Sequence, residues 1–218
     1  MLYARPKPLL YLLLLFAAAI LGGCTSTPAP PGKSELSAID TGEMTLLLLR
    51  VAASIEGEAH EPFSGSLEGD NIGIGLGTFE TGGRAKPSGP WRFFSEDSRA
   101  QGWTYLSVPH GTLYFAFLPP RRTHILHYIA MFESAPLWRI DVPEKSKLVY
   151  VGTLAVDGES DFYLFGGKSL NHFKRMEIRD EREAAQALAD RHVPGLGPIK
   201  TALMQRHDGP IILTTPTD

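Results

Sequence analysis

The sequence predicts a mainly β protein: an antiparallel β-sandwich with a small C-terminal helical appendage, preceded by a signal peptide and a tether. Two observations predict the sandwich. Several short apolar or alternating segments are separated by turns that contain glycine or proline, which is typical of antiparallel sandwiches. No expected strand is followed by a long helical pattern, which disfavours a doubly wound parallel sheet. We expect the sandwich domain to span residues 43–178 and the appendage, packed on it, to span residues 179–218.

The strongest strand candidate is the continuous apolar run of residues 45–53, which predicts a central strand buried on both faces. Two pairs of segments flank short turns, and each pair predicts a β-hairpin. The first pair is residues 103–108 and 112–118, and the second is residues 138–142 and 147–156. Shorter candidates complete the series: residues 91–94, residues 162–165 after a turn at Asp157-Gly158, and residues 172–178.

The C-terminal region changes to a helical pattern. Asp180 is followed three residues later by Glu183, a capping-box pattern that predicts a helix with Asp180 as its N-cap. Pro194-Gly195 ends that helix. We expect a short second helix over residues 199–205 and a final strand over residues 211–214.

The N-terminus carries the strongest functional signal. Two basic residues, Arg5 and Lys7, precede the apolar run of residues 9–21. This run is shorter than the roughly 20 residues that a membrane-spanning helix needs, which favours a signal peptide. It ends in Leu21-Gly22-Gly23-Cys24, which contains the only cysteine of the chain.

This tetrapeptide resembles the lipobox of bacterial lipoproteins. The resemblance implies a signal peptide over residues 1–23, cleavage before Cys24 and attachment of acyl chains such as palmitate to that cysteine. Several acyl chains together hold a protein firmly on a membrane. Thr25, in place of an aspartate, implies the outer membrane of the cell envelope, with the domain facing the periplasm. The alternative is an ordinary secretory signal cut near Ala17-Ala18-Ala19, in which Cys24 has no role.

The segment after the cysteine predicts a flexible tether over residues 24–42. Residues 25–33 are rich in proline and poor in large side chains, a composition that favours extended polyproline geometry. At about 3 Å per residue the tether would span roughly 50 Å. The alternative is that part of this segment packs on the domain.

The charge of the chain excludes one class of partner. The sequence contains 21 basic and 24 acidic residues, and the leader removes two of the bases, which leaves the mature part at −5. A nucleic-acid surface needs clustered Lys and Arg to displace counterions from phosphates. We therefore expect no nucleic-acid partner.

Two segments resemble a known fold. Residues 108–114 (Val-Pro-His-Gly-Thr-Leu-Tyr) resemble the turn and strand of prealbumin-like (transthyretin-like) β-sandwiches. Residues 138–154, with Val142-Pro143 and Tyr150-Val-Gly-Thr153, resemble a feature of uncharacterised bacterial envelope lipoproteins with such domains. The resemblance covers residues 45–178 and implies an envelope lipoprotein with no established reaction. Its motifs are packing and turn motifs, which indicate fold more than activity.

One cluster of basic side chains is a candidate ligand contact. Arg121, Arg122, His124 and His127 lie within seven residues and could form a cationic loop for phosphate or lipid head groups. The two histidines could also supply metal ligands, but the glutamate of a zinc-protease motif and a third ligand are missing. We expect no metal or cofactor. A solvated loop without a ligand is the simplest interpretation.

Other motifs are better explained by structure than by chemistry. The glycines of residues 73–77 predict a strand, and Gly166-Gly167-Lys168-Ser169 and residues 157–161 predict hairpin turns and not phosphate or calcium loops. Residues 64–69 lack the first glycine of a G-x-S-x-G elbow, and we expect no catalytic residue. The three tryptophans predict core packing, with an aromatic ligand groove as the alternative: Trp91, Trp103 and Trp138.

These observations rank three functional hypotheses. The first is a membrane-anchored envelope lipoprotein with a non-catalytic β-sandwich that acts in structure or in interaction with an envelope protein. The second is an envelope module that binds a small molecule, a lipid or an anion. The third is a hydrolase without a recognisable motif.

Overall fold

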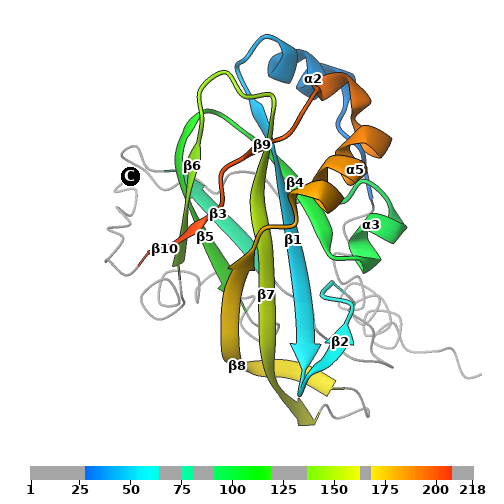
Figure 1. Ribbon diagram of the computed structural model, residues 1–218, viewed down its shortest axis with the longest axis vertical. Coiled ribbons are helices and arrows are strands. Elements are labelled where there is room, and N and C mark those ends of the chain that lie inside the picture. Colours follow the sequence, from blue (N-terminus) through cyan, green and yellow to red (C-terminus); the bar gives the residue numbers. More distant parts are fainter. Residues whose placement is uncertain (1–27, 64–74, 81–90, 119–136, 163–167, 208–218) are drawn as a thin grey trace, which may run out of the picture.

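The computed structural model describes residues 28–63, 75–80, 91–118, 137–162 and 168–207 of the chain (Figure 1). These residues form two β-sheets and helices that pack against one of them. The prediction of a mainly β protein is confirmed.

The first sheet, sheet A, is centred on β1 (Thr45–Ile55) and β7 (Leu148–Phe162), which lie side by side. On the other side of β1, two strands pair antiparallel with its first and last parts: β4 (Trp103–Val108) and β2 (Glu58–His60). On the other side of β7 lie β8 (Lys168–Arg179), which is antiparallel to it, and β9 (Lys200–Thr201), which is parallel.

The second sheet, sheet B, is antiparallel throughout its described strands. In spatial order it consists of β10 (Gln205–His207), β6 (Leu137–Val142), β5 (Gly111–Leu118) and β3 (Gly75–Glu80). The expected strand within the glycine-rich segment is therefore confirmed as β3.

The central pair of sheet A corrects the prediction of an antiparallel arrangement, because β1 and β7 run parallel, with Leu46 opposite Leu148 and Ile55 opposite Gly158. Parallel neighbours need a long crossover, and here the chain between β1 and β7 supplies the β3, β5 and β6 strands of sheet B. An apolar pattern identifies a strand but does not give its direction, which is why the sequence did not reveal this pair.

Both predicted hairpins are wrong in their pairing, although their strands form as expected. β4 lies in sheet A and the next strand, β5, in sheet B; β6 lies in sheet B and β7 in sheet A. Each short turn therefore carries the chain from one sheet to the other. The side chain of His110, in the first turn, contacts the second turn, with Nδ1 3.1 Å from the carbonyl oxygen of Pro143. Its Nε2 lies 2.8 Å from the carbonyl oxygen of Gly42, in the turn before β1.

One apolar core contains side chains of both sheets. Leu47, Leu49 and Val51 of β1 pack there with Phe115 of β5 and Ile140 of β6. A second core covers the opposite, outer face of sheet A. There Leu46 and Leu48 of β1 pack under two helices, α2 (Lys33–Asp40) and α5 (Arg182–His192). Residues 45–49 are consequently 0% exposed. The prediction of a strand buried on both faces over residues 45–53 is confirmed for residues 45–49 only, because Arg50 and Ala52 are partly exposed.

The flexible tether expected over residues 24–42 is wrong for its second half. Residues 33–40 form α2, whose Ile39 is fully buried in the second core. Glu35 of this helix accepts hydrogen bonds from Arg92 and Ser107. Leu36 and Ile39 form an apolar face of α2 that packs on the sheet. The proline-rich composition of the segment made this face hard to recognise in the sequence.

The C-terminal predictions are confirmed only in part. α5 forms and ends before the 3-10 turn η2 (Pro194–Leu196), as expected. Its N-cap is Glu181 and not Asp180, with no side-chain cap, because Glu181 binds other partners described below. The predicted second helix is instead β9 and an extended segment, in which the amides of Ala202 and Met204 donate to carbonyl oxygens of β7.

Three smaller predictions have mixed outcomes. Residues 91–94 contribute only an isolated bridge, between Arg92 and Tyr105. Asp157-Gly158 is no turn, because β7 continues through it with a shift in register. Residues 172–178 are part of β8, as expected. Of the strand predicted over residues 162–165, only Phe162 is described, as the last residue of β7. The strand predicted over residues 211–214 lies outside the described residues.

Candidate functional site

The outer face of sheet A is only partly covered. Beyond Leu48, the outward side chains of β1 are Arg50, Ala52 and Ser54, and all three are partly exposed. Figure 1 shows α2 and α5 at one end of this sheet and β2 at the other. Two adjoining cavities, of about 280 and 320 Å³, occupy the uncovered part and share Ala52, Ala53 and Ala59. We call this uncovered part the open groove.

The floor of the open groove is made of small side chains. Ala52 and Ser54 of β1, Ala59 of β2 and Ala155 of β7 line it. Their size leaves the backbone of the sheet close to the surface. The shape of the groove suits an extended segment more than a bulky, deeply buried ligand.

The charges along one side of the open groove neutralise one another. On β8, Glu177 lies between Arg175 and Arg179 and is paired with both. The hydrogen bonds from Arg179 and Arg175 hold the pKa of the Glu177 carboxyl below its usual value. Asp157 on β7 accepts a hydrogen bond of 2.6 Å from the Ser54 hydroxyl, which lowers its pKa. This side therefore carries little net charge for attracting an ion.

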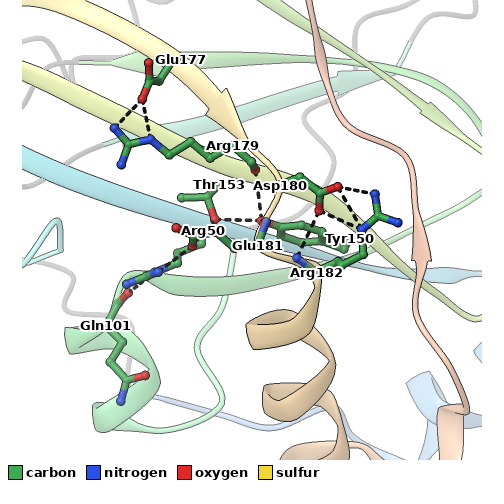
Figure 2. Close-up of polar contacts among 9 residues, drawn as sticks. All are labelled: Arg50, Gln101, Tyr150, Thr153, Glu177, Arg179, Asp180, Glu181 and Arg182. Atoms are coloured by element: carbon green, nitrogen blue, oxygen red, sulfur yellow. Dashed lines mark hydrogen bonds and ion pairs between the residues drawn. The ribbon is translucent and has the colours of Figure 1, made fainter.

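A polar network lies at the end of the open groove nearest α5. Figure 2 shows most of its side chains. The carboxylate of Glu181 accepts hydrogen bonds from Arg50 Nη1 at 2.6 Å and from Thr153 Oγ1 at 2.8 Å. The Tyr150 hydroxyl lies 2.8 Å from Thr153 Oγ1 and accepts from the Glu181 amide at 3.0 Å. The Arg50 guanidinium also lies over the Trp103 ring, 5.5 Å from its centroid, and its Nε donates to the Gln101 carbonyl oxygen.

A bulge in β7 brings the two hydroxyls of this network together. Gly152 has φ of 116°, and the pairing of β1 with β7 shifts register beside it, between Leu48 and Arg50. Residues three apart on a regular strand point to opposite faces. The extra residue of the bulge places Tyr150 and Thr153 on the same face instead. A Cβ atom at Gly152 would lie 2.7 Å from Ile178 Cγ2, so only glycine fits.

The ionisation of Glu181 indicates a structural role for the network. Burial raises the pKa of Glu181, but the hydrogen bonds from Arg50 and Thr153 together outweigh that effect and lower it. Burial raises the pKa of Tyr150 above its usual value. A carboxyl that acts as a general acid near neutral pH needs a raised pKa. Glu181 is therefore an ionised acceptor that fixes the start of α5 to β1 and β7.

The residues that the sequence singled out for ligand or lipid chemistry lie outside the described residues. They are Cys24, Arg121, Arg122, His124 and His127. The same is true of residues 64–69 and of Gly166-Gly167, although β7 and β8 pair on either side of the latter. The three tryptophans are at most 6% exposed, which confirms the prediction of core packing.

Two further features concern the described part of the chain alone. Within it, no group of three or more His, Cys, Asp and Glu side chains is placed to hold a metal ion. None of the helices described is both long and apolar enough to span a membrane.

The sequence reasoning missed the Glu181 network. One signal was available: Arg50 is the only charged residue in the apolar run of residues 45–53. A charge in a strand buried on both faces needs a partner, and Arg50 marks the point where burial on the outer face ends.

Comparison with known proteins finds no counterpart: no family model, no curated protein and no solved structure matches this chain.

Proposed function

We propose that the protein is a lipid-anchored protein of the bacterial cell envelope whose domain is non-catalytic and serves structure or protein interaction. The observation that carries the proposal is Leu21-Gly22-Gly23-Cys24, which ends an apolar leader and holds the only cysteine. We further propose that the mature chain begins at Cys24, is acylated there, and faces the periplasm from the outer membrane.

We also propose that sheets A and B form a β-sandwich. The shared core of sheets A and B supports a β-sandwich, related to the prealbumin-like type. If the domain is related to the prealbumin-like type, that relationship includes the parallel pairing of β1 with β7.

The open groove supports interaction with a protein as the role of the domain. Its floor of alanine and serine brings the sheet backbone near the surface, and its side formed by β8 is electrically balanced. A surface of this kind fits an extended, largely uncharged segment of a partner, which would bind through packing on the alanine floor and through hydrogen bonds to side chains that line the groove, such as Ser54.

The anchor is tested by Cys24→Ala, with Thr25→Ala as the matched control. After carbonate washing, we expect the parent and the control in the membrane pellet with incorporated labelled palmitate. The Cys24→Ala protein should lose the label and leave the pellet. A Cys24→Ala protein that stays in the washed membranes would contradict the proposal.

The second candidate is a module that binds a small molecule, a lipid or an anion, and the cavities of the open groove favour it. Small-molecule pockets typically hold about 300–1,000 Å³, whereas these cavities are about 280 and 320 Å³, at the lower limit. A ligand that copurifies in native mass spectrometry would support this candidate. An unchanged ligand load in Arg121→Ala and Arg122→Ala proteins would exclude the predicted cationic loop as its site.

A further inference from the structure

The folded part of the chain begins close to the proposed lipid attachment site. The amide of Ala29 donates to the carbonyl oxygen of Phe93 at 2.9 Å, and the carbonyl oxygen of Ala29 accepts from the Tyr105 hydroxyl. Tyr105 is 0% exposed, and the Arg92 guanidinium lies 4.7 Å from its ring centroid. Ala29 is therefore fixed on a well-packed part of the domain, next to β4.

The chain between the two points is short. Five residue steps separate Cys24 from Ala29, and at no more than about 3.6 Å per residue they span at most about 18 Å. The tether expected from the sequence would have allowed roughly 50 Å. The difference arises because Ala29 is already bound to the domain and residues 33–40 form α2, which is held on β4 by Glu35.

Ala29 lies beside the core on the outer face of sheet A. Tyr105 belongs to the second core, on the outer face of sheet A, together with Leu188 of α5 and Ile39 of α2. Phe94 follows Phe93, whose carbonyl oxygen accepts from the Ala29 amide. The Phe94 ring stacks on Tyr105 in the same core, with ring centroids 4.4 Å apart. Sheet B lies on the opposite side of sheet A (Figure 1).

We propose that the acylated N-terminus holds the domain directly against the bilayer, with the helix-covered end of the outer face of sheet A next to the lipid head groups and sheet B away from them. This inference rests on the proposed lipid anchor. The partner surface is a lipid surface, and the short connection determines which side of the domain meets it.

The charges near Ala29 indicate that the connection, and not charge attraction, keeps the domain there. Arg92 is paired with Glu35, and Arg99 of α3 (Glu96–Ala100) with Glu96. Lys147, immediately before β7, is paired with Asp40 of α2. Together α2, α3 and α5 carry four Lys and Arg side chains and six Asp and Glu side chains. Because this face has no excess of positive charge, we expect the same proximity on neutral and on anionic vesicles and at high salt.

The test compares two labelled positions in the full, natively acylated protein. Asp97→Cys places a thiol on exposed α3, and Asp141→Cys places one on the outward side of β6. Acylation blocks the Cys24 thiol, so a maleimide donor dye reacts only at the introduced position. The proteins are reconstituted into vesicles of phosphatidylethanolamine and phosphatidylglycerol that carry an acceptor dye on the head groups.

We expect energy transfer to the lipid acceptor to be more efficient from position 97 than from position 141. A spacer of about ten Gly-Ser residues inserted before Pro28 adds roughly 17 Å of reach and should abolish most of that difference. Equal transfer from both positions without the spacer, or a difference that survives it, would overturn the inference. Protein that fails to float with the vesicles, or whose Cys24 reacts with maleimide, would instead contradict the lipid anchor.

Discussion

The two halves of β1 lie in the same sheet but in different surroundings. Residues 45–49 are buried by sheet B on one face and by α2 and α5 on the other. Beyond them burial alternates: Val51, Ala53 and Ile55 are buried, whereas Arg50, Ala52 and Ser54 are partly exposed on the open groove. The change occurs where the β7 bulge and the Glu181 network lie.

This comparison separates the half of β1 that is buried in the two cores from the half that forms the floor of the open groove. A run of apolar residues without alternation marks the covered half, and the return of alternation marks the half that faces solvent. If the division is correct, substitutions on the covered half should destabilise the fold, and those in the open groove should affect binding with little cost in stability.

The largest expected difference lies between Leu48→Ala and Ala52→Ser. Leu48 is 0% exposed under the helices, and removing a buried leucine typically costs about 2–5 kcal/mol of unfolding free energy. Ala52 lines the open groove, and a surface substitution there should stay within about 0.5 kcal/mol. Urea unfolding of the two variants measures both values. Similar losses in the two variants would contradict the division of β1.

Gly152→Ala tests the β7 bulge, which lies beside the boundary between the two halves of β1. The substitution forces a side chain into a left-handed backbone position and against Ile178, so we expect a loss of about 1–3 kcal/mol. Gly195→Ala is the control, because its Cβ would meet no atom within 4 Å and its φ is not positive. Urea unfolding should separate them clearly, and a neutral Gly152→Ala would show that the bulge is not required.

Glu181→Gln has a smaller effect that depends on pH. We expect a loss of about 1–2 kcal/mol near pH 7, because the charged acceptor of the network is lost. The folded state lowers the pKa of Glu181 below the unfolded value of 4.5. Its contribution is therefore complete above pH 4.5 and disappears as the pH falls through the folded pKa.

Urea unfolding at several pH values measures this effect. The parent protein should lose stability below pH 4.5 more steeply than Glu181→Gln does. Glu183→Gln, on the exposed first turn of the same helix, should follow the parent. Parallel pH profiles for the parent and Glu181→Gln would show that the carboxylate is not held by Arg50 and Thr153.

The sequence predicted the strands well but not their partners. The apolar run of β1 and the alternation of β5 and β6 follow from burial, which is a local property of each strand. Direction and pairing depend on distant residues. Pro109 and Gly111 indicate a turn, but they do not distinguish a hairpin from a crossing between two sheets.

The candidate site was less predictable because its parts come from distant segments. Arg50, Thr153 and Glu181 meet only through the β1–β7 pairing and the bulge at Gly152. The packing of α2 was missed for a similar reason: four residues of proline and alanine precede it, and its two apolar side chains are recognisable as a buried face only beside sheet A. The lipid anchor, in contrast, rests on contiguous residues and remains a prediction from the sequence.

The intact mass of the protein extracted from its native membranes tests the anchor most directly. The account predicts a chain that begins at Cys24 and carries the added mass of acyl groups on that residue. A chain that begins near Ala19, or that begins at Cys24 with an unmodified thiol, would contradict it.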